Sequence, residues 1–251
     1  ILHQQTATDI AILNADDPWV VALETPGHRR LFSLRGPVAD GCYLDDAHVV
    51  EITAEGERVE LFATADMHIE GRHNLANAMA AALLARSQGV EPEAIVRGLA
   101  AFDGLPHRLE RVAEIGGVVY WDDSKGTNVG ATIGSLAGFE DGTVHVILGG
   151  DPKDQDFAPL APVVAAKARA VYLIGEAAPA LAEVLDDSTD ILQVETLDRA
   201  VSAASRVARS GEAVVLSPAC ASFDQFRNFI ARGRAFQALV RELQHGGTHG
   251  A

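Results

Sequence analysis

The chain has 251 residues, of which 48% are hydrophobic and 22% charged, so it can bury one large core or two ordinary ones. Acidic side chains outnumber basic ones 35 to 20, and a formal net charge of −15 argues against a nucleic-acid partner, because such binding needs Lys and Arg to neutralise phosphates. No apolar run approaches the ~18 residues that span a bilayer, and two cysteines cannot form a disulfide framework. We therefore expect a cytoplasmic protein with no membrane partner. Because it opens on Ile1 and not Met, we expect it to be part of something longer.

The hydrophobic pattern of residues 1–64 predicts short strands. An apolar run at 10–13 predicts a first strand, and Asp17-Pro18 after it is typical of a helix start. Alternating apolar and polar residues, separated by Gly, Pro and Asp, predict a meander of small strands at 30–34, 49–53 and 59–63.

Two helices are predicted next. Asn74 is expected to cap a helix over 75–88, which Gly89 would end in the left-handed conformation. Pro92 favours the first turn of a second helix over 91–101. The pattern changes at Gly104, so we predict two domains, 1–104 and 105–251.

The second region alternates strands and helices. Strands are predicted at 118–121, 144–148, 170–174 and 213–216, with Gly116-Gly117 turning a hairpin from 111–115 into the first of them. Helices are predicted near 128–138, 157–167, 177–185, 196–209 and 223–243. Such βαβ repetition predicts an α/β fold with a mostly parallel sheet covered by helices on both faces.

Three polar loops follow strands of this sheet. They read DDSKGTN from Asp122, GGDPKD from Gly149 and SPACAS from Ser217. Ligands bind outside the carboxyl ends of parallel strands, so these loops are expected to share a binding edge. Each also has a structural interpretation: Asn128 or Thr127 can cap a helix, and Ser222 with Gln225 fits a capping box.

Other motifs are weaker. Cys220 has no His at motif spacing, so a small packed residue is the favoured interpretation over a nucleophile. The chain contains neither G-x-G-x-x-G nor G-x-x-x-x-G-K-[ST], so a triphosphate cradle must come from elsewhere. Asn74 and Asn77 lie three residues apart, on one face of a helix. Their side-chain amides could form hydrogen bonds with a planar base. The alternative is that one caps the helix and the other is a solvated side chain. His107 and Arg108 lie just past the predicted domain boundary, where they could bind an anion between the domains. The alternative is a packed His beside a surface Arg.

Taken in order, four strings resemble one family, the Mur ligases. They are GRHNLANA from Gly71, GLPHRLE from Gly104, the string from Asp122 to Asn128, and SPACASFDQF from Ser217. The Asp123–Asn128 string points to the family members that add D-glutamate. The resemblance covers nearly the whole chain. It implies that 1–104 is the second half of a P-loop-type α/β ATPase domain, and that 105–251 is a Rossmann-like domain binding the amino acid.

The resemblance implies an ATP-dependent ligase of peptidoglycan synthesis. Its substrates would be UDP-N-acetylmuramoyl-L-alanine, D-glutamate and ATP with Mg²⁺. The metal ligands would lie outside this chain. We expect the enzyme to act as a monomer. Nucleotide contacts are implied for Asn74, Asn77, His107, Arg108, Asp123 and Lys125, with Lys125, His107 and Arg108 also catalytic. D-Glutamate contacts are implied for Thr127, Lys153, Ser222, Phe223 and Phe229.

Two alternatives remain open. One is a non-catalytic binding module with a ligase-like fold, which the missing phosphate motif favours and the intact amino-acid loops oppose. The other is a ligase similar to folylpolyglutamate synthetase, which the string after Asp122 disfavours. Because the phosphate cradle and the metal ligands are missing, we expect this chain alone to be inactive as a ligase.

Overall fold

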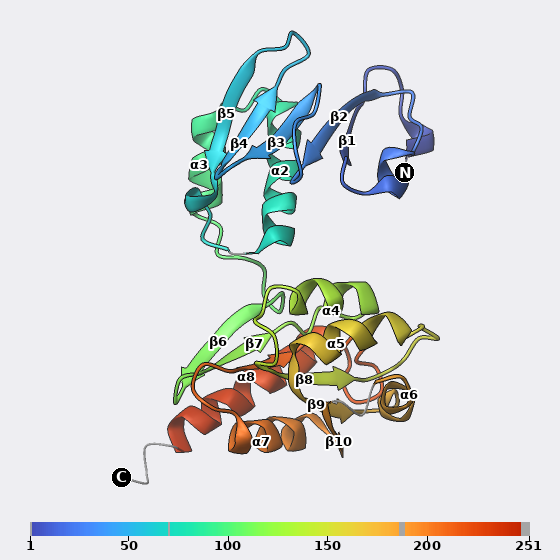
Figure 1. The fold of residues 1–251 in the computed structure, drawn as a ribbon, viewed down its shortest axis with the longest axis vertical. Coiled ribbons are helices and arrows are strands. Elements are labelled where there is room, and N and C mark those ends of the chain that lie inside the picture. Colours follow the sequence, from blue (N-terminus) through green and yellow to red (C-terminus); the bar gives the residue numbers. More distant parts are fainter. Residues whose placement is uncertain (1, 70, 186–188, 247–251) are drawn as a thin grey trace. The chain divides into compact units, whose positions relative to one another are not determined.

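The structure is a computed structural model that describes residues 2–69, 71–185 and 189–246. The chain divides into two compact units, Ile1–Gly104 and Leu105–Ala251 (Figure 1). Both combine strands and helices, so the predicted α/β class is confirmed. Within the described residues, no helix is long and apolar enough to cross a membrane.

The first unit contains a five-stranded sheet in the order β1-β2-β3-β4-β5. The strands are β1 Ile10–Asn14, β2 His28–Ser33, β3 Gly41–Asp45, β4 His48–Ile52 and β5 Arg58–Ala63. The observed meander is β3, β4 and β5, which pair antiparallel, whereas β1, β2 and β3 pair in parallel. The predicted strands at 49–53 and 59–63 therefore belong to the meander, and the one at 30–34 does not. The sequence did not predict β3, whose short apolar run between Gly and Asp residues lacks a clear alternation.

In the described part of this unit, three α-helices accompany the sheet: α1 Pro18–Val21, α2 Arg72–Arg86 and α3 Pro92–Ala100. Pro92 begins α3 and Gly89 has φ +76°, as predicted. The predicted cap at Asn74 is wrong. Gly71 occupies the N-cap position with φ 105°, so α2 starts three residues earlier than a cap at Asn74 requires and Asn74 lies inside its first turn.

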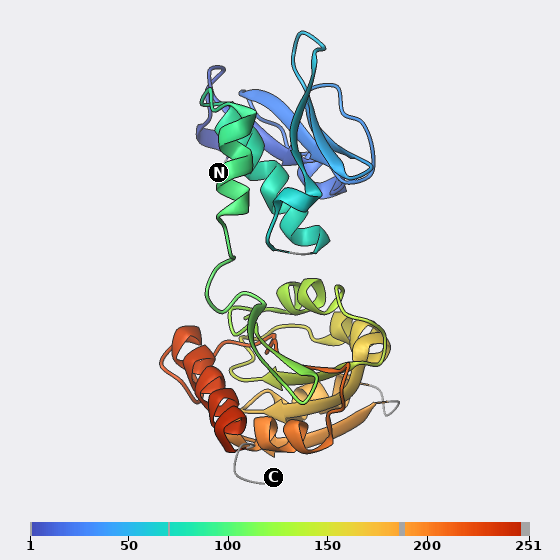
Figure 2. The same cartoon turned by 90° about the vertical axis from the view of Figure 1, so that its left-hand side faces the viewer.

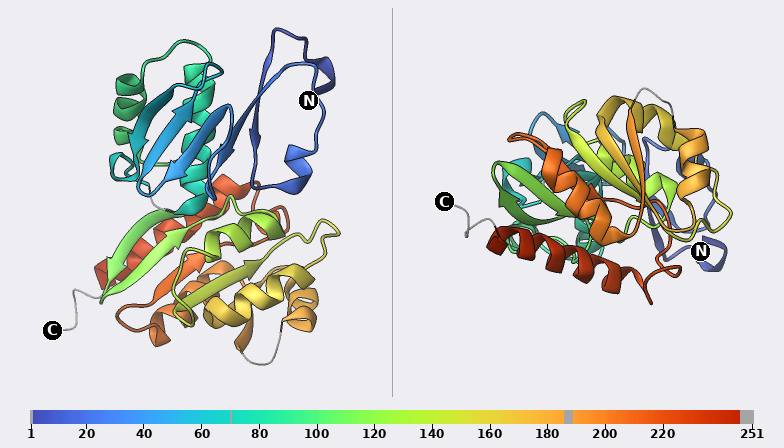
Figure 3. Two further views of the ribbon diagram at one scale, coloured as in Figure 1. Left: turned by 45° about the horizontal axis from the view of Figure 1, so that its top comes forward. Right: turned by 90° about the horizontal axis from the view of Figure 1, so that it is seen from below.

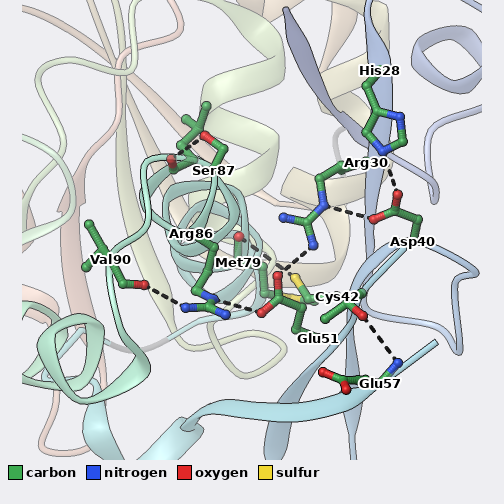
Figure 4. Close-up of polar contacts among 12 residues, drawn as sticks. His28, Arg30, Asp40, Cys42, Glu51, Glu57, Met79, Arg86, Ser87 and Val90 are labelled. Carbon is green, nitrogen blue, oxygen red and sulfur yellow. Dashed lines mark hydrogen bonds and ion pairs between the residues drawn. The ribbon is translucent and has the colours of Figure 1, made fainter. Parts of the chain in front are cut away.

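A buried ion network joins α2 to the sheet (Figure 4). The Glu51 carboxylate on β4 accepts hydrogen bonds from Arg30 Nη2 on β2 at 2.6 Å and from Arg86 Nε on α2 at 2.8 Å. Arg30 Nε also donates to Asp40 at 2.9 Å. Because each buried charge has an opposite partner, the network fixes the helix without leaving a costly unpaired ion. We assign it a structural role.

The second unit contains a six-stranded sheet in the order β10-β9-β8-β11-β7-β6. The strands are β6 Glu110–Ile115, β7 Val118–Asp122, β8 Val144–Gly149, β9 Ala168–Ile174, β10 Asp190–Glu195 and β11 Ala213–Leu216. All neighbours pair in parallel except β6, which forms the predicted hairpin with β7 through Gly116 and Gly117 (Figure 3). The edge strand β10 was not predicted, because its outer residues are largely polar and exposed.

Helices cover both faces of this sheet (Figure 2). They are α4 Val129–Leu136, α5 Ala161–Lys167, α6 Ala178–Val184, α7 Leu197–Val207 and α8 Phe229–Gly246. Leu136, Val164 and Leu181 from α4, α5 and α6 pack in one core cluster. Val201 from α7 and Phe236 from α8 pack in the other. The predicted doubly covered parallel sheet is therefore confirmed.

The predicted helix at 223–243 starts later than expected. Helix α8 begins at Phe229, and Asn228 Oδ1 accepts the amide of Ala231 at 2.8 Å as its cap. The Ser222 carbonyl instead accepts the amides of Gln225 and Phe226 in a turn. The predicted capping box at Ser222 is therefore wrong, because Ser222 belongs to a separate turn and Asn228 caps the helix.

Candidate functional site

The three predicted loops meet at the carboxyl edge of the second sheet. The chain passes from β7 to β8 and later returns to insert β11 between them, which creates a switch in strand order. Two of the loops are bonded directly: the amide of Gly149 donates to the Pro218 carbonyl at 2.9 Å, and Asp151 and Ala221 exchange two backbone hydrogen bonds of 3.0 Å. The expected common edge is confirmed.

Backbone strain gathers around the same edge. Residues other than glycine rarely adopt positive φ, and such strain persists mainly where function or packing requires it. Within the described part of the second unit, the non-glycine residues with positive φ are His107, Leu109, Lys153, Asp154, Glu195 and Ala219. All six lie in or beside the loops at the carboxyl ends of the strands. This concentration supports a functional role for the edge.

Asp123 faces the interior. It is 5% exposed, its Oδ1 accepts the Leu109 amide, and its Oδ2 accepts Ser135 Oγ at 2.8 Å and Ser217 Oγ at 2.7 Å. Burial raises the pKa of this carboxyl group above its usual value, partly opposed by those hydrogen bonds. Asp123 therefore ties two loops and α4 together, and its contact with a nucleotide stays a prediction.

Lys125 and Phe229 form a cationic and aromatic pair. Lys125 Nζ lies 4.4 Å from the centroid of the Phe229 ring. The Lys125 amide donates to the His107 carbonyl at 3.0 Å, which fixes the loop beside His107. Thr127 is half-buried in the same loop, while Asn128 caps α4 through Ala131, as its structural interpretation predicted.

His107 is buried in a polar cluster. Its Nδ1 lies 2.7 Å from Asp122 Oδ2, and its amide donates to Glu110 Oε2 at 2.9 Å. The ligand atoms of His107, Glu110 and Asp122 lie within 4.8 Å of one another, a spacing that a metal ion can use. Gln237 Nε2 donates to both carboxylates, at 2.9 and 3.1 Å. Protein donors therefore already satisfy this cluster.

The remaining candidates differ in exposure. Arg108 and Lys153 are exposed, and neither forms an ion pair with any residue that the structure describes. Phe223 is 67% exposed, whereas Ser222 is 2% exposed. Asn74 and Asn77 lie on α2 in the other unit, with Asn77 exposed. The structure thus brings the second unit's candidates to one edge and leaves the two asparagines in the first unit.

Sequence reasoning missed Arg232. This side chain is 1% exposed on α8, and its guanidinium donates to the carbonyls of Ser124, Cys220 and Ala221 and to Ser124 Oγ. Its hydrogen bonds connect the loop after β7 to the loop after β11. The available signal was its position four residues before the buried Phe236, within the apolar stripe of the helix.

Both cysteines are expected to resist alkylation in the folded protein. Burial raises the pKa of Cys42 and of Cys220 to about 12, so at pH 8 only about one thiol in ten thousand is ionised. Reaction with a thiol reagent should be slow in buffer and rapid after unfolding in urea, with two thiols titrated per chain. Fast modification of Cys220 in the folded chain would contradict the packed-residue interpretation and restore a nucleophile.

Comparison with known proteins identifies the family. Residues 107–220 match the family described as Mur ligase, glutamate ligase domain. The chain is 46% identical over 239 residues to the UDP-N-acetylmuramoylalanine–D-glutamate ligase of Thiobacillus denitrificans, covering 93% of this chain and 49% of that protein. It is 45% identical to the protein of that name from Methylococcus capsulatus, with 93% and 51% covered. The chain thus spans about half the length of these curated relatives.

Solved structures share the fold. MurF ligase from Thermotoga maritima, in complex with ADP, superposes with a TM-score of 0.63 at 16% identity, covering 96% of this chain and 56% of that one. A pseudomurein peptide ligase type C from Methanothermus fervidus gives 0.65 at 13% identity, covering 92% and 56%. At these identities the likeness concerns the fold alone. The matched domain shows that residues 107–220 belong to the Mur ligase family, and the sequence relatives show that the similarity extends over most of this chain.

Proposed function

We propose that this chain is part of an ATP-dependent ligase that joins D-glutamate to UDP-N-acetylmuramoyl-L-alanine in cytoplasmic peptidoglycan synthesis. The observation that carries the proposal is the joining of the three loops at one sheet edge, with Lys125, Thr127, Lys153 and Ser222 in them. Relatives 46% and 45% identical to this chain are named for that reaction. A monomer without nucleic-acid or membrane partners remains our expectation.

The reaction needs positioned anions. A carboxylate is a poor electrophile, so transfer of phosphate from ATP would convert it to an acyl phosphate, which the amine of D-glutamate then attacks with release of phosphate. Holding the reactants in order lowers such a barrier by about 7–11 kcal/mol. In a chain of net charge −15, the exposed cations Arg108 and Lys153 supply local attraction for anionic substrates.

We assign roles by chemistry. Lys125 and Arg108 would face nucleotide phosphates, and His107 and Asp123 would line the nucleotide. Asn74 and Asn77 would contact the adenine. Lys153, Thr127, Ser222, Phe223 and Phe229 would surround D-glutamate. For Mg²⁺ the described residues of this edge do not fit, because protein donors already occupy the carboxylates of Asp122 and Asp123. We therefore assign no Mg²⁺ ligand to this chain.

The test is phosphate release from ATP. The full-length enzyme should release phosphate only when D-glutamate and UDP-N-acetylmuramoyl-L-alanine are both present, and omission of either substrate is the control. L-Glutamate in place of D-glutamate tests the amino-acid assignment. Release that does not depend on D-glutamate would reject this function.

The present chain alone is expected to show no turnover. Its sequence lacks the G-x-x-x-x-G-K-[ST] phosphate cradle, and phosphoryl transfer depends on such positioning. The same three substrates should therefore yield phosphate no faster than a blank without protein. Turnover of about 1 per second, an ordinary enzymatic rate, would contradict the expectation.

A further inference from the structure

Asp122 receives three hydrogen bonds at the end of β7. Its Oδ1 accepts the amide of Ser124 at 3.0 Å, and its Oδ2 accepts Gln237 Nε2 at 2.9 Å and faces His107 Nδ1 at 2.7 Å. The side chain is completely buried. A carboxylate accepts at both oxygens and an amide NH₂ group only donates, so this arrangement suits an ionised Asp122.

The position of the His107 proton follows from this contact. Because Asp122 Oδ2 is an acceptor, Nδ1 of the neutral ring must carry its hydrogen, which leaves Nε2 as a hydrogen-bond acceptor. Among the described residues none forms a hydrogen bond with Nε2, whereas Nδ1 lies against Asp122 and Gly233. A side chain at Gly233 would lie 2.2 Å from Nδ1, so α8 packs directly against the ring.

The backbone holds the ring in place. His107 has φ +64°, and its amide and carbonyl are fixed by Glu110 and by the Lys125 amide. The Phe229 ring meets the imidazole edge-on, with centroids 6.2 Å apart. Because the ring is held on these sides, a change of proton position, and not rotation, is the ready response to a change at residue 122.

We propose that Asp122 is a positioning residue that keeps the His107 proton on Nδ1 and so presents Nε2 as an acceptor. The ligand group opposite His107 must then be a hydrogen-bond donor, such as a hydroxyl, and not a phosphate oxygen. Only this last step rests on the proposed function, through the assignment of His107 to the bound nucleotide. The inference about the proton itself concerns this chain alone.

A metal site is the competing interpretation of the same cluster. The N–H groups of Gln237 and His107 already point at the oxygens that a cation would need. A metal ion would therefore have to displace these donors. The geometry favours the hydrogen-bonded cluster.

The test is ¹⁵N NMR of the histidine ring in this chain, recorded at a pH where the ring shifts show the neutral form. The unsubstituted chain should show His107 protonated on Nδ1. In Asp122→Asn the amide oxygen stays on the Ser124 amide and its NH₂ group faces the ring, so the proton should move to Nε2. Protonation on Nε2 in the unsubstituted chain, or an unchanged tautomer in Asp122→Asn, would overturn the proposal.

Gln237→Leu is the matched control. It also removes two hydrogen bonds from the cluster but leaves the His107–Asp122 contact, so the proton should stay on Nδ1. Movement of the proton in this variant would attribute the effect to loss of packing and overturn the role of Asp122. Titration of the unsubstituted chain with Zn²⁺ should leave the His107 shifts unchanged, and a stoichiometric change would support the metal site instead.

Kinetics of the full-length enzyme separate this inference from the proposed function. Asp122→Asn should lower kcat/KM for ATP about 10- to 100-fold, the effect of one mismatched buried hydrogen bond, with little change in the KM for D-glutamate. If the tautomer reverses and the kinetics with ATP do not change, the proton assignment holds and the nucleotide role of His107 fails.

Discussion

Replacing Arg232 with alanine is expected to lower the free energy of unfolding of the second unit by about 3–5 kcal/mol. The guanidinium makes four hydrogen bonds of 3.0 Å to groups in the loops after β7 and β11. Alanine would leave three carbonyl groups and the Ser124 hydroxyl without this donor, and it would open a cavity under both loops. Both consequences fall on the carboxyl edge of the sheet, which carries the candidate site.

Arg232 is expected to be charged at neutral pH although its pKa is lowered. Burial lowers the pKa of Arg232 to about 10, with nearby carboxylates partly opposing the shift. The folded pKa is thus below the unfolded value, so above about pH 10 the unfolded state binds more protons at this group, and the contribution of Arg232 to stability rises with pH there. At neutral pH the group stays charged, and its hydrogen bonds offset the cost of burying it.

Urea denaturation measures the loss. The chain has two tryptophans, Trp19 in the first unit and Trp121 in the second. In a Trp19→Phe background, fluorescence therefore reports the second unit. Arg234→Ala is the matched control, because Arg234 is exposed on the same helix and its removal should cost under about 0.5 kcal/mol. Equal losses in the two variants would contradict the role assigned to Arg232.

The sequence predicted the scaffold of the site better than its interior. Apolar runs ending in polar loops located β7, β8 and β11, and the rule for parallel strands placed their loops together. These signals are local or follow from topology. Strands β3 and β10 pair with strands that lie nearby in the sequence, but they were missed because their own short segments lack a clear apolar pattern.

The direction of individual side chains was harder to predict. Asp123 reads as a surface carboxylate within a ligand loop, yet its oxygens are satisfied by Ser135 and Ser217, which are 12 and 94 residues away. Arg232 reads as one of several arginines of an amphipathic helix, yet it is buried under the loops. Partners at such separations leave no local pattern, so burial of a charged group could be recognised only from the fold.

Lys153→Ala in the full-length enzyme is expected to raise the KM for D-glutamate about 10- to 100-fold, through loss of a charge-assisted contact worth about 1.5–3 kcal/mol. Lys153 lies in the strained loop after β8, with φ +49°. Gln155 fixes this loop by donating to the carbonyls of Pro152 and Ala219. The backbone is therefore held while the ammonium group remains exposed for an anionic ligand.

Because α8 begins at Phe229 and not at Ser222, Lys153 becomes the main source of positive charge for the substrate carboxylate. A helix beginning at Ser222 would have offered its own amide groups and dipole to the substrate carboxylate, but α8 begins at Phe229. The positive charge opposite the Ser222 turn must then come mainly from a side chain. A contact of Lys153 with Asp151, Asp154 or Asp156 is the competing interpretation, worth under about 1 kcal/mol, and within the described residues none of them forms such an ion pair.

Steady-state kinetics decide between these interpretations. Arg169→Ala is the matched control, because it removes an exposed positive charge from the opposite end of the sheet, at the start of β9. It should leave the KM for D-glutamate nearly unchanged, and neither variant should alter the KM for ATP strongly. Equal increases in both variants would indicate a general effect of net charge. An unchanged KM and kcat in Lys153→Ala would show that Lys153 does not hold the substrate.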